Sequence, residues 1–275
     1  MKTLVTHINP HLDDILAIWL FKKFHAEFSD AKVEFLSAAK DGVTWEGKIV
    51  DSDPNVIHFG IGRGKYDEHK GDQGESAGSL VWKDIQSSGF APKDEIEAKA
   101  LDELVKWNTL LDTGKAPNFE FSEFSVQSFI RPLDSKPDSS LQALEMGEWI
   151  LDRIWEALKR KQQSIKDWEK VVVFESNLGK GVAVSSQTVD RSFCKRMGGD
   201  LFIIYNPKYK SVQFFTPSQI IDLEPIFKKV KELDPDADWY FHQSHHILIC
   251  GSHTAPDSKP TKLSFEQLIE VAKSI

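Results

Sequence analysis

Hydrophobic residues in the first half of the chain gather in short runs that alternate with longer stretches of helical periodicity. The short apolar runs at 3–7, 33–39 and 55–61 predict buried strands. Apolar residues recur at helical spacing over 13–28, 76–86 and 94–111. This order of strands and helices predicts a mainly parallel α/β sheet.

The pattern changes after the stretch 131–140, Arg-Pro-Leu-Asp-Ser-Lys-Pro-Asp-Ser-Ser, which is rich in Pro and Ser. A long amphipathic helix follows over 141–165, and then short apolar strands alternate with turns. Helices near 223–233 and 264–274 close the chain. We therefore expect a first domain over 1–135, a linker and connecting helix over 136–167, and a smaller α/β domain over 168–275.

Composition narrows the class of protein. The 275 residues are 40 % hydrophobic, which suits a folded globular chain, and the net charge is −8. An acidic chain lacks the broad basic surface that grips long nucleic acid, so any such contact must be local, and a small phosphorylated substrate fits equally well. The two cysteines make no disulfide framework, and neither a signal peptide nor a membrane-spanning stretch is visible. We expect a soluble cytoplasmic protein with no membrane partner.

Two clusters of metal-binding residue types follow predicted strands. The first is His7-Ile-Asn-Pro-His11-Leu-Asp13-Asp14, at a junction between strand and helix. The second is Tyr66-Asp67-Glu68-His69, which follows the glycine-rich segment 60–64. The carboxyl ends of parallel strands share one edge of a sheet, where ligands bind. Imidazole and carboxylate together suit Mn, Fe, Co or Zn better than Ca.

These clusters resemble the motifs of the DHH phosphoesterase superfamily. His-x-Asn-Pro-x-x-Asp is similar to the superfamily's first motif, and Asp67-Glu68-His69 resembles its Asp-His-His triplet. The chain resembles most closely the melanocyte-proliferating-gene family of DHH-type nucleases, through the Ser76-Ala-Gly helix and Asp112-Thr-Gly. The four motifs keep their order and approximate spacing over residues 1–114. This resemblance implies a DHH-type metal-binding domain, with the active site in a cleft between it and the second domain.

The resemblance also implies a set of site residues. The metal ligands it implies are His7, His11, Asp13, Glu68 and Asp112. Glu68 replaces the superfamily's metal-binding His. For the Asp that bridges two metals, His58 stands at the matching place, and Asp51 and Asp53 are alternatives in the preceding turn. His69 faces the substrate as a catalytic residue, and Asp67 supports the cluster.

The function that follows is metal-dependent hydrolysis of phosphodiester bonds, in the manner of an exonuclease acting on oligonucleotide ends. One or two divalent ions are expected, Mn first, with Mg, Co, Zn and Fe as alternatives. Arg191, His253 and Lys262 are expected to bind the phosphate from the second domain. Hydrolysis of a small nucleotide or another phosphoester is an alternative, as is a non-catalytic metal-binding module. A homodimer is compatible with the sequence.

Overall fold

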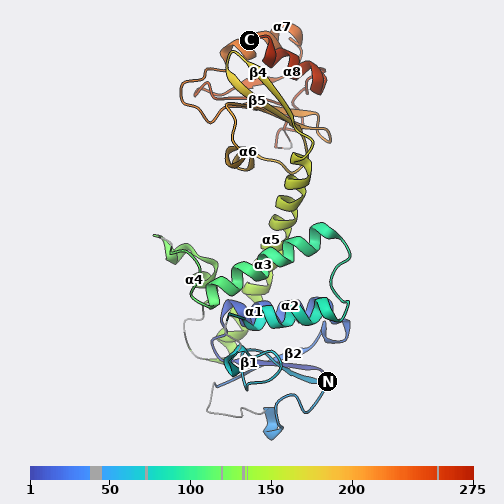
Figure 1. Ribbon diagram of the computed structural model, residues 1–275, viewed down its shortest axis with the longest axis vertical. Helices are drawn as coiled ribbons and strands as arrows, with labels where there is room; N and C mark the ends of the chain where they lie inside the picture. The colour runs from blue at the N-terminus through green and yellow to red at the C-terminus, as the bar shows by residue number, and fades with distance from the viewer. Residues whose placement is uncertain (38–44, 72–73, 119, 132–133, 135, 253) are drawn as a thin grey trace. The chain divides into compact units, whose positions relative to one another are not determined.

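The computed structural model describes residues 1–37, 45–71, 74–118, 120–131, 134, 136–252 and 254–275. The chain divides into two compact units, Met1–Lys159 and Arg160–Ile275 (Figure 1). Each unit has a sheet of its own. A helix that is both long and apolar enough to cross a membrane is absent from the described residues.

The first unit is built on a three-stranded sheet in the order β2-β1-β3. Its strands are β1 (Thr3–His7), β2 (Lys32–Leu36) and β3 (Val56–His58). Both pairings are parallel, which confirms the predicted parallel sheet. The carboxyl ends of all three strands therefore lie along one edge.

Helices surround or extend this sheet, with short 3-10 turns between them. The helices are α1 (Leu12–Phe24), α2 (Ala77–Ser87), α3 (Glu95–Asp112), α4 (Val126–Ile130) and α5 (Pro137–Trp168). The 3-10 turns are η1 (Ala26–Phe28), η2 (Trp45–Gly47), η3 (Glu68–Lys70) and η4 (Ser122–Phe124). Figure 1 shows α1 and α2 side by side.

Helix α1 is the centre of this unit. Its residues from Leu12 to Phe21 are all buried, and apart from Asp13 and Asp14 they are apolar, as expected of a helix packed on several neighbours. Two glycines allow these neighbours to approach. A Cβ at Gly78 of α2 would lie 2.9 Å from Leu16, and one at Gly147 of α5 would lie 2.8 Å from Ile15.

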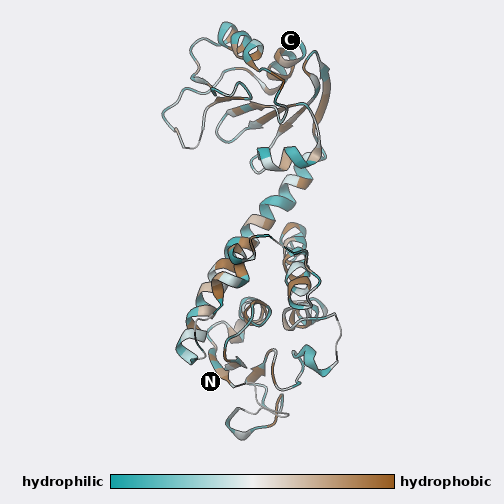
Figure 2. Cartoon of the chain, turned by 90° about the vertical axis from the view of Figure 1, so that its left-hand side faces the viewer, coloured by the Kyte–Doolittle hydropathy of each residue, from teal (hydrophilic) through white to brown (hydrophobic). Residues whose placement is uncertain are grey.

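The second unit has a mixed sheet of six strands in the order β4-β5-β6-β7-β9-β8. The strands are β4 (Val172–Ser176), β5 (Gly179–Ser185), β6 (Leu201–Asn206), β7 (Ser211–Phe215), β8 (Trp239–Phe241) and β9 (Ile247–Cys250). Only the pair β5–β6 is parallel among these pairings of described strands. Helices α6 (Arg191–Met197), α7 (Glu224–Leu233) and α8 (Phe265–Lys273) complete it. The strands carry the hydrophobic colour in Figure 2.

Several element boundaries differ from those predicted. The helix expected over 13–28 ends at Phe24, because His25 takes an extended conformation and caps it. The helix expected from 141 begins at Pro137, inside the Pro-Ser stretch that was predicted as linker. Proline is well tolerated in the first turn of a helix, where its missing N–H is not needed.

Candidate metal centre

The first group of metal-binding side chains lies where β1 ends and α1 begins. His7, His11 and Asp14 each offer a ligand atom, and these atoms lie within 4.8 Å of one another. Asp14 is 1 % exposed, and its Oδ2 lies 3.0 Å from His7 Nε2. The same oxygen accepts a hydrogen bond of 2.8 Å from the backbone N–H of His11. The first turn of α1 therefore holds the Asp14 carboxylate within reach of both imidazoles.

A second group shares His11 with the first. Ligand atoms of His11, Asp13 and Asp112 also lie within 4.8 Å of one another. Burial raises the pKa of Asp13 well above its usual value, and the negative charges of Asp14, Asp112 and Glu68 raise it further. A hydrogen bond joins the Asp13 and Asp112 carboxyl groups, so one of them must carry a proton.

The third group is the triplet Asp67, Glu68 and His69, in which Asp67 caps the start of η3. Asp67 is 2 % exposed and accepts hydrogen bonds from the backbone N–H groups of Arg63 at 2.5 Å and His69 at 3.0 Å. Its Oδ1 also lies 2.9 Å from His69 Nδ1. Since a carboxylate can only accept, His69 Nδ1 carries a proton and donates it to this bond. Asp67 therefore orients His69, whose side chain remains exposed.

Glu68 connects the third group to the other two electrostatically. Burial raises its pKa to about 7, with the Asp14 and Asp112 charges adding to that effect and His69 opposing it. The pKa of Asp112 is raised by burial and by Asp14. One oxygen of Glu68, Oε2, is buried and finds no hydrogen-bond partner among the described residues. Four carboxyl groups thus converge without enough positive charge to balance them.

His7 can act as a metal ligand through Nε2 once the proton on that nitrogen is lost. Its Nδ1 lies 2.8 Å from the carbonyl oxygen of Ile8, which can only accept, so Nδ1 carries a proton. Burial lowers the pKa of His7, but the hydrogen bond to Asp14 and the Asp14 charge outweigh it and bring the pKa to about 9. Loss of the Nε2 proton leaves a lone pair directed at the acidic cluster. A backbone carbonyl that fixes the other ring nitrogen is typical of metal-binding imidazoles.

Gly60, just after β3, allows this geometry. A Cβ at this position would lie 1.9 Å from Asp14 Oδ1. Gly60 also has a φ of +62°, a left-handed conformation that other residues rarely adopt. Its N–H donates to the carbonyl of Tyr66 at 2.9 Å, which ties the strand end to the segment carrying the triplet. The absence of a side chain at Gly60 therefore leaves the space that the Asp14 carboxylate occupies.

The three residues considered for the bridging position lie apart from these groups. His58 is on β3, 2 % exposed, and both its ring nitrogens lack a partner among the described residues. Burial lowers its pKa, and the charge that opposes this comes from Asp51. Asp51 Oδ2 accepts from the backbone N–H of Lys65 at 2.6 Å, and Asp53 pairs with Lys48 at 2.9 Å. Within the described residues, none of these three belongs to a group of metal-binding side chains.

The residues predicted to bind phosphate from the second half of the chain lie in the second unit. Arg191 is the first residue of α6. Lys262 Nζ lies 3.3 Å from Asp236 Oδ2, and the Lys262 side chain is 78 % exposed. His253 lies outside the described residues. Their role toward a substrate stays a prediction.

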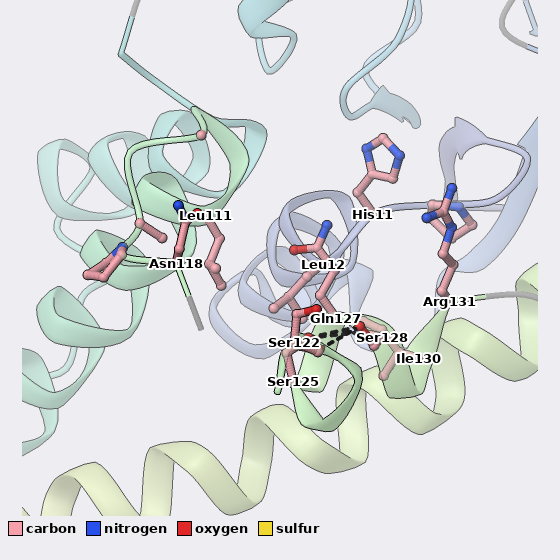
Figure 3. A pocket seen from close by; sticks show the side chains of 14 residues that line it. His11, Leu12, Leu111, Asn118, Ser122, Ser125, Gln127, Ser128, Ile130 and Arg131 are labelled. Atoms are coloured by element: carbon pink, nitrogen blue, oxygen red, sulfur yellow. Dashed lines mark hydrogen bonds between the residues drawn. The ribbon is translucent and has the colours of Figure 1, made fainter. Parts of the chain in front are cut away.

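A cavity of about 530 Å³ adjoins the metal centre within the first unit, and His11 is part of its wall. Figure 3 shows its labelled residues, which come from the start of α1, the end of α3 and the segment after it, and α4 with its flanks. About half of the wall is polar, with serine hydroxyls, Asn118 and Gln127. Arg131 supplies a cation to the same wall. The cavity is suited to an anionic group beside the metal-binding side chains.

The sequence prediction did not include Asp14 or Arg131 as site residues. Asp14 stands next to Asp13, and its position as the third residue of a helix after a histidine cap was the available signal. Arg131 was placed in the predicted linker because a proline follows it. Its role becomes visible only when α4 and the segment after α3 are brought to His11.

Comparisons with known proteins give weak likenesses. The sequence matches no family model and no curated protein. Among solved structures, RecJ from Thermus thermophilus in complex with Mg²⁺ is 12 % identical, with a TM-score of 0.33 over 99 % of this chain and 49 % of that one. This chain thus spans about half the length of that RecJ chain.

Two further solved structures cover more of their own length. The DHH domain of a member of the s1p family of ribosomal proteins is 12 % identical, with a TM-score of 0.32 over 99 % of this chain and 86 % of that one. An exopolyphosphatase-related protein from Bacteroides fragilis is 11 % identical, with a TM-score of 0.26 over 98 % and 89 %. Likenesses at these TM-scores establish no activity, so the function is argued from the site itself. Membership of the melanocyte-proliferating-gene family stays a prediction.

Proposed function

We propose that this protein is a divalent-metal-dependent phosphoesterase whose metal centre is formed by His7, His11, Asp13, Asp14, Glu68 and Asp112. The observation that carries the proposal is that three carboxyl groups meet two imidazoles in two groups that share His11, with the charge of Glu68 acting on the same carboxyl groups. Asp14 takes the carboxylate position for which His58, Asp51 and Asp53 were considered. The two groups that share His11 offer places for one ion or two.

A divalent cation fits the donor set of this site. Burial of several like charges is costly unless a cation balances them, and the raised pKa values of Asp13, Glu68 and Asp112 express that cost. The buried Glu68 Oε2 also lacks a partner among the described residues. A mixture of imidazole and carboxylate suits Mn and its neighbours in the first transition row, and Mg remains an alternative.

When bound, such a cation lowers the pKa of a water molecule toward about 7 and offsets the charge of a phosphate. The residues of this chain supply the remaining functions. Arg131 can donate two parallel hydrogen bonds to two oxygens of a phosphate. His69, which Asp67 orients and which is exposed, can keep a proton on Nε2 for the leaving oxygen. Burial lowers the pKa of His69, but the hydrogen bond to Asp67 and the nearby carboxylates outweigh burial and raise the pKa.

We favour the ends of oligonucleotides as the substrate. The net charge of −8 limits contact with nucleic acid to a local site, and a chain end is a local target. Hydrolysis of small nucleotides is the second candidate, because the polar cavity of about 530 Å³ is large enough for a single nucleotide.

The test is hydrolysis of short oligonucleotides, mononucleotides and bis(p-nitrophenyl) phosphate by the full chain in the presence of Mn, Mg, Co or Zn. We expect turnover that chelation abolishes and that restored Mn recovers. Metal binding measured by calorimetry in parallel distinguishes a phosphoesterase from a protein that binds metal without turnover. Tight metal binding with no turnover of any substrate identifies a binding module, whereas no metal binding contradicts the proposed centre itself.

A further inference from the structure

A second cavity, of about 620 Å³, continues from the polar cavity beside the metal centre. The two cavities share Leu12, Leu111, Asn118, Ser125 and Gln127, all of which Figure 3 labels. Leu12 follows the metal-binding His11, and Leu111 precedes Asp112. The second cavity therefore begins next to the residues that hold the proposed metal.

The wall of this second cavity is aromatic and apolar. Trp107, Phe121 and Phe124 line it, and 40 %, 64 % and 75 % of their surfaces are exposed. The rings of Phe121 and Phe124 are 6.5 Å apart and meet edge to face. Exposed aromatic surface of this extent gathered around a cavity indicates a binding site for a flat apolar group.

One buried polar side chain, Asn108, also lines this cavity. It is 2 % exposed, and both its amide nitrogen and its amide oxygen lack a hydrogen-bond partner among the described residues. Leaving such a group unsatisfied is costly, so native structures almost always pair it. Asn108 is four residues before Asp112 on α3, one helical turn or about 6 Å along the same face. The cavity thus joins an unpaired donor and acceptor to the metal centre.

We propose that this second cavity binds the nucleobase of the substrate whose phosphate lies at the metal centre, a step that rests on the proposed function. Aromatic side chains stack on a base whatever its identity. The carboxamide of Asn108 offers one acceptor and two donors, which match the donor and acceptor on a base edge. An acyl chain would fill the apolar wall but would leave Asn108 unpaired.

The experiment compares a short oligonucleotide with the same oligonucleotide carrying an abasic residue at the end that is cleaved. The variants are Asn108→Leu and the double variant Phe121→Ala/Phe124→Ala. Phe129→Ala is the matched control, because Phe129 is 62 % exposed on the neighbouring α4 but is not among the residues that line either cavity. We expect the wild type to prefer the natural end about tenfold or more in kcat/KM, since stacking on aromatic rings has effects of this size.

The variants should lose that preference through KM, whereas Phe129→Ala keeps it and bis(p-nitrophenyl) phosphate is hydrolysed by all of them. Equal use of natural and abasic ends by the wild type overturns the inference and leaves the proposed function standing. If no phosphoester is hydrolysed, the proposed function fails. Quenching of the protein's tryptophan fluorescence, to which Trp107 contributes, by adenosine and cytidine, compared with ribose, then decides the inference. The base site is supported if the nucleosides quench the fluorescence and Asn108→Leu weakens this quenching. An equal response to ribose overturns it.

Discussion

At the scale of single residues, the candidate site depends on carboxyl groups that are buried among one another. Asp13 and Asp14 are 3 % and 1 % exposed, and both belong to the first turn of α1. The positive end of the helix favours negative charge there, but four converging carboxyl groups exceed what a helix end can balance. Each of these carboxyl groups is therefore expected to matter more for binding a cation than for folding.

Asp13→Asn should abolish metal-dependent hydrolysis without loss of fold. Asparagine keeps the shape of the side chain but removes the charge that a cation needs, and it also removes a buried carboxyl group whose ionised form the charges of Asp14, Asp112 and Glu68 disfavour. We expect the metal-free variant to be at least as stable as the wild type in urea denaturation. Asp30→Asn, at an exposed position, is the control. Wild-type turnover by Asp13→Asn would show that Asp13 is not a ligand.

Gly60→Ala should weaken metal binding by displacing Asp14. An added Cβ would lie 1.9 Å from Asp14 Oδ1, so the carboxylate must move away from His7. Gly89→Ala is the matched control, because Gly89 also has a positive φ, of +75°, and has open space around it. Both variants bear the backbone cost of about 1 kcal/mol. Calorimetric titration with Mn should show at least a tenfold weaker Kd for Gly60→Ala alone, and equal affinities would contradict this role of Gly60.

At the scale of elements, the first strand and the two helices that follow the triplet follow from the sequence pattern. The predicted strand at 3–7 coincides with β1, and the helices predicted at 76–86 and 94–111 lie one residue from α2 and α3. Patterning works here because these elements are each buried on a definite face. β8 was not predicted, since its three residues Trp239–Phe241 are too short to show a period.

The site was predictable to a lesser degree than the fold. His7, His11 and Asp13 lie within one local motif, and His11 shares one group of metal-binding side chains with His7 and another with Asp13. Asp14 was left out because adjacent carboxylates look alike in sequence, while only burial against Gly60 distinguishes this one. Asp112 was expected only from the resemblance, because it reaches the site through helix packing. Arg131 reaches the cavity in the same way and was missed, since packing of distant elements leaves no local signal.

Gly147→Ala tests the packing of α5 on α1. Alanine improves helix propensity by about 1 kcal/mol, but its Cβ would lie 2.8 Å from Ile15 Cγ2. Overpacking of this kind costs about 1–3 kcal/mol, so we expect a net loss of about 1 kcal/mol in the free energy of unfolding of the first unit. Urea denaturation followed by tryptophan fluorescence measures it. A gain of stability would mean that α5 shifts without cost.

At the scale of the whole molecule, the titrating groups of the metal centre predict how stability depends on pH. The pKa of Glu68 is raised by burial to about 7, so its charged form disfavours the fold, and stability falls as pH rises from about 4.5 to about 7. The pKa of His7 is raised to about 9 by Asp14 against the effect of burial. Its contribution is complete below about 6.5 and is lost as pH rises through about 9.

Both groups act in the same direction, so the chelated protein should melt at a higher temperature at pH 5.5 than at pH 8.5. Scanning calorimetry measures the difference, with the shift in Tm about 2–4 °C per kcal/mol for a unit of this size. Saturating Mn should reverse the trend, because a cation replaces the protons and binds better at high pH. A melting temperature of the chelated protein that rises over this pH range would contradict the proposed protonation of the cluster.

The spacing of the ligands along the chain also has a consequence for how the protein is made. The site draws on residues from His7 at the end of β1 to Asp112 at the end of α3, so it is complete only when more than a hundred residues have left the ribosome and folded. Loops of this length close late, after local helices have formed. A cation that needs the finished site cannot guide the nascent chain. The cation binds after folding, and it then slows unfolding and lengthens the lifetime of the folded unit against proteolysis.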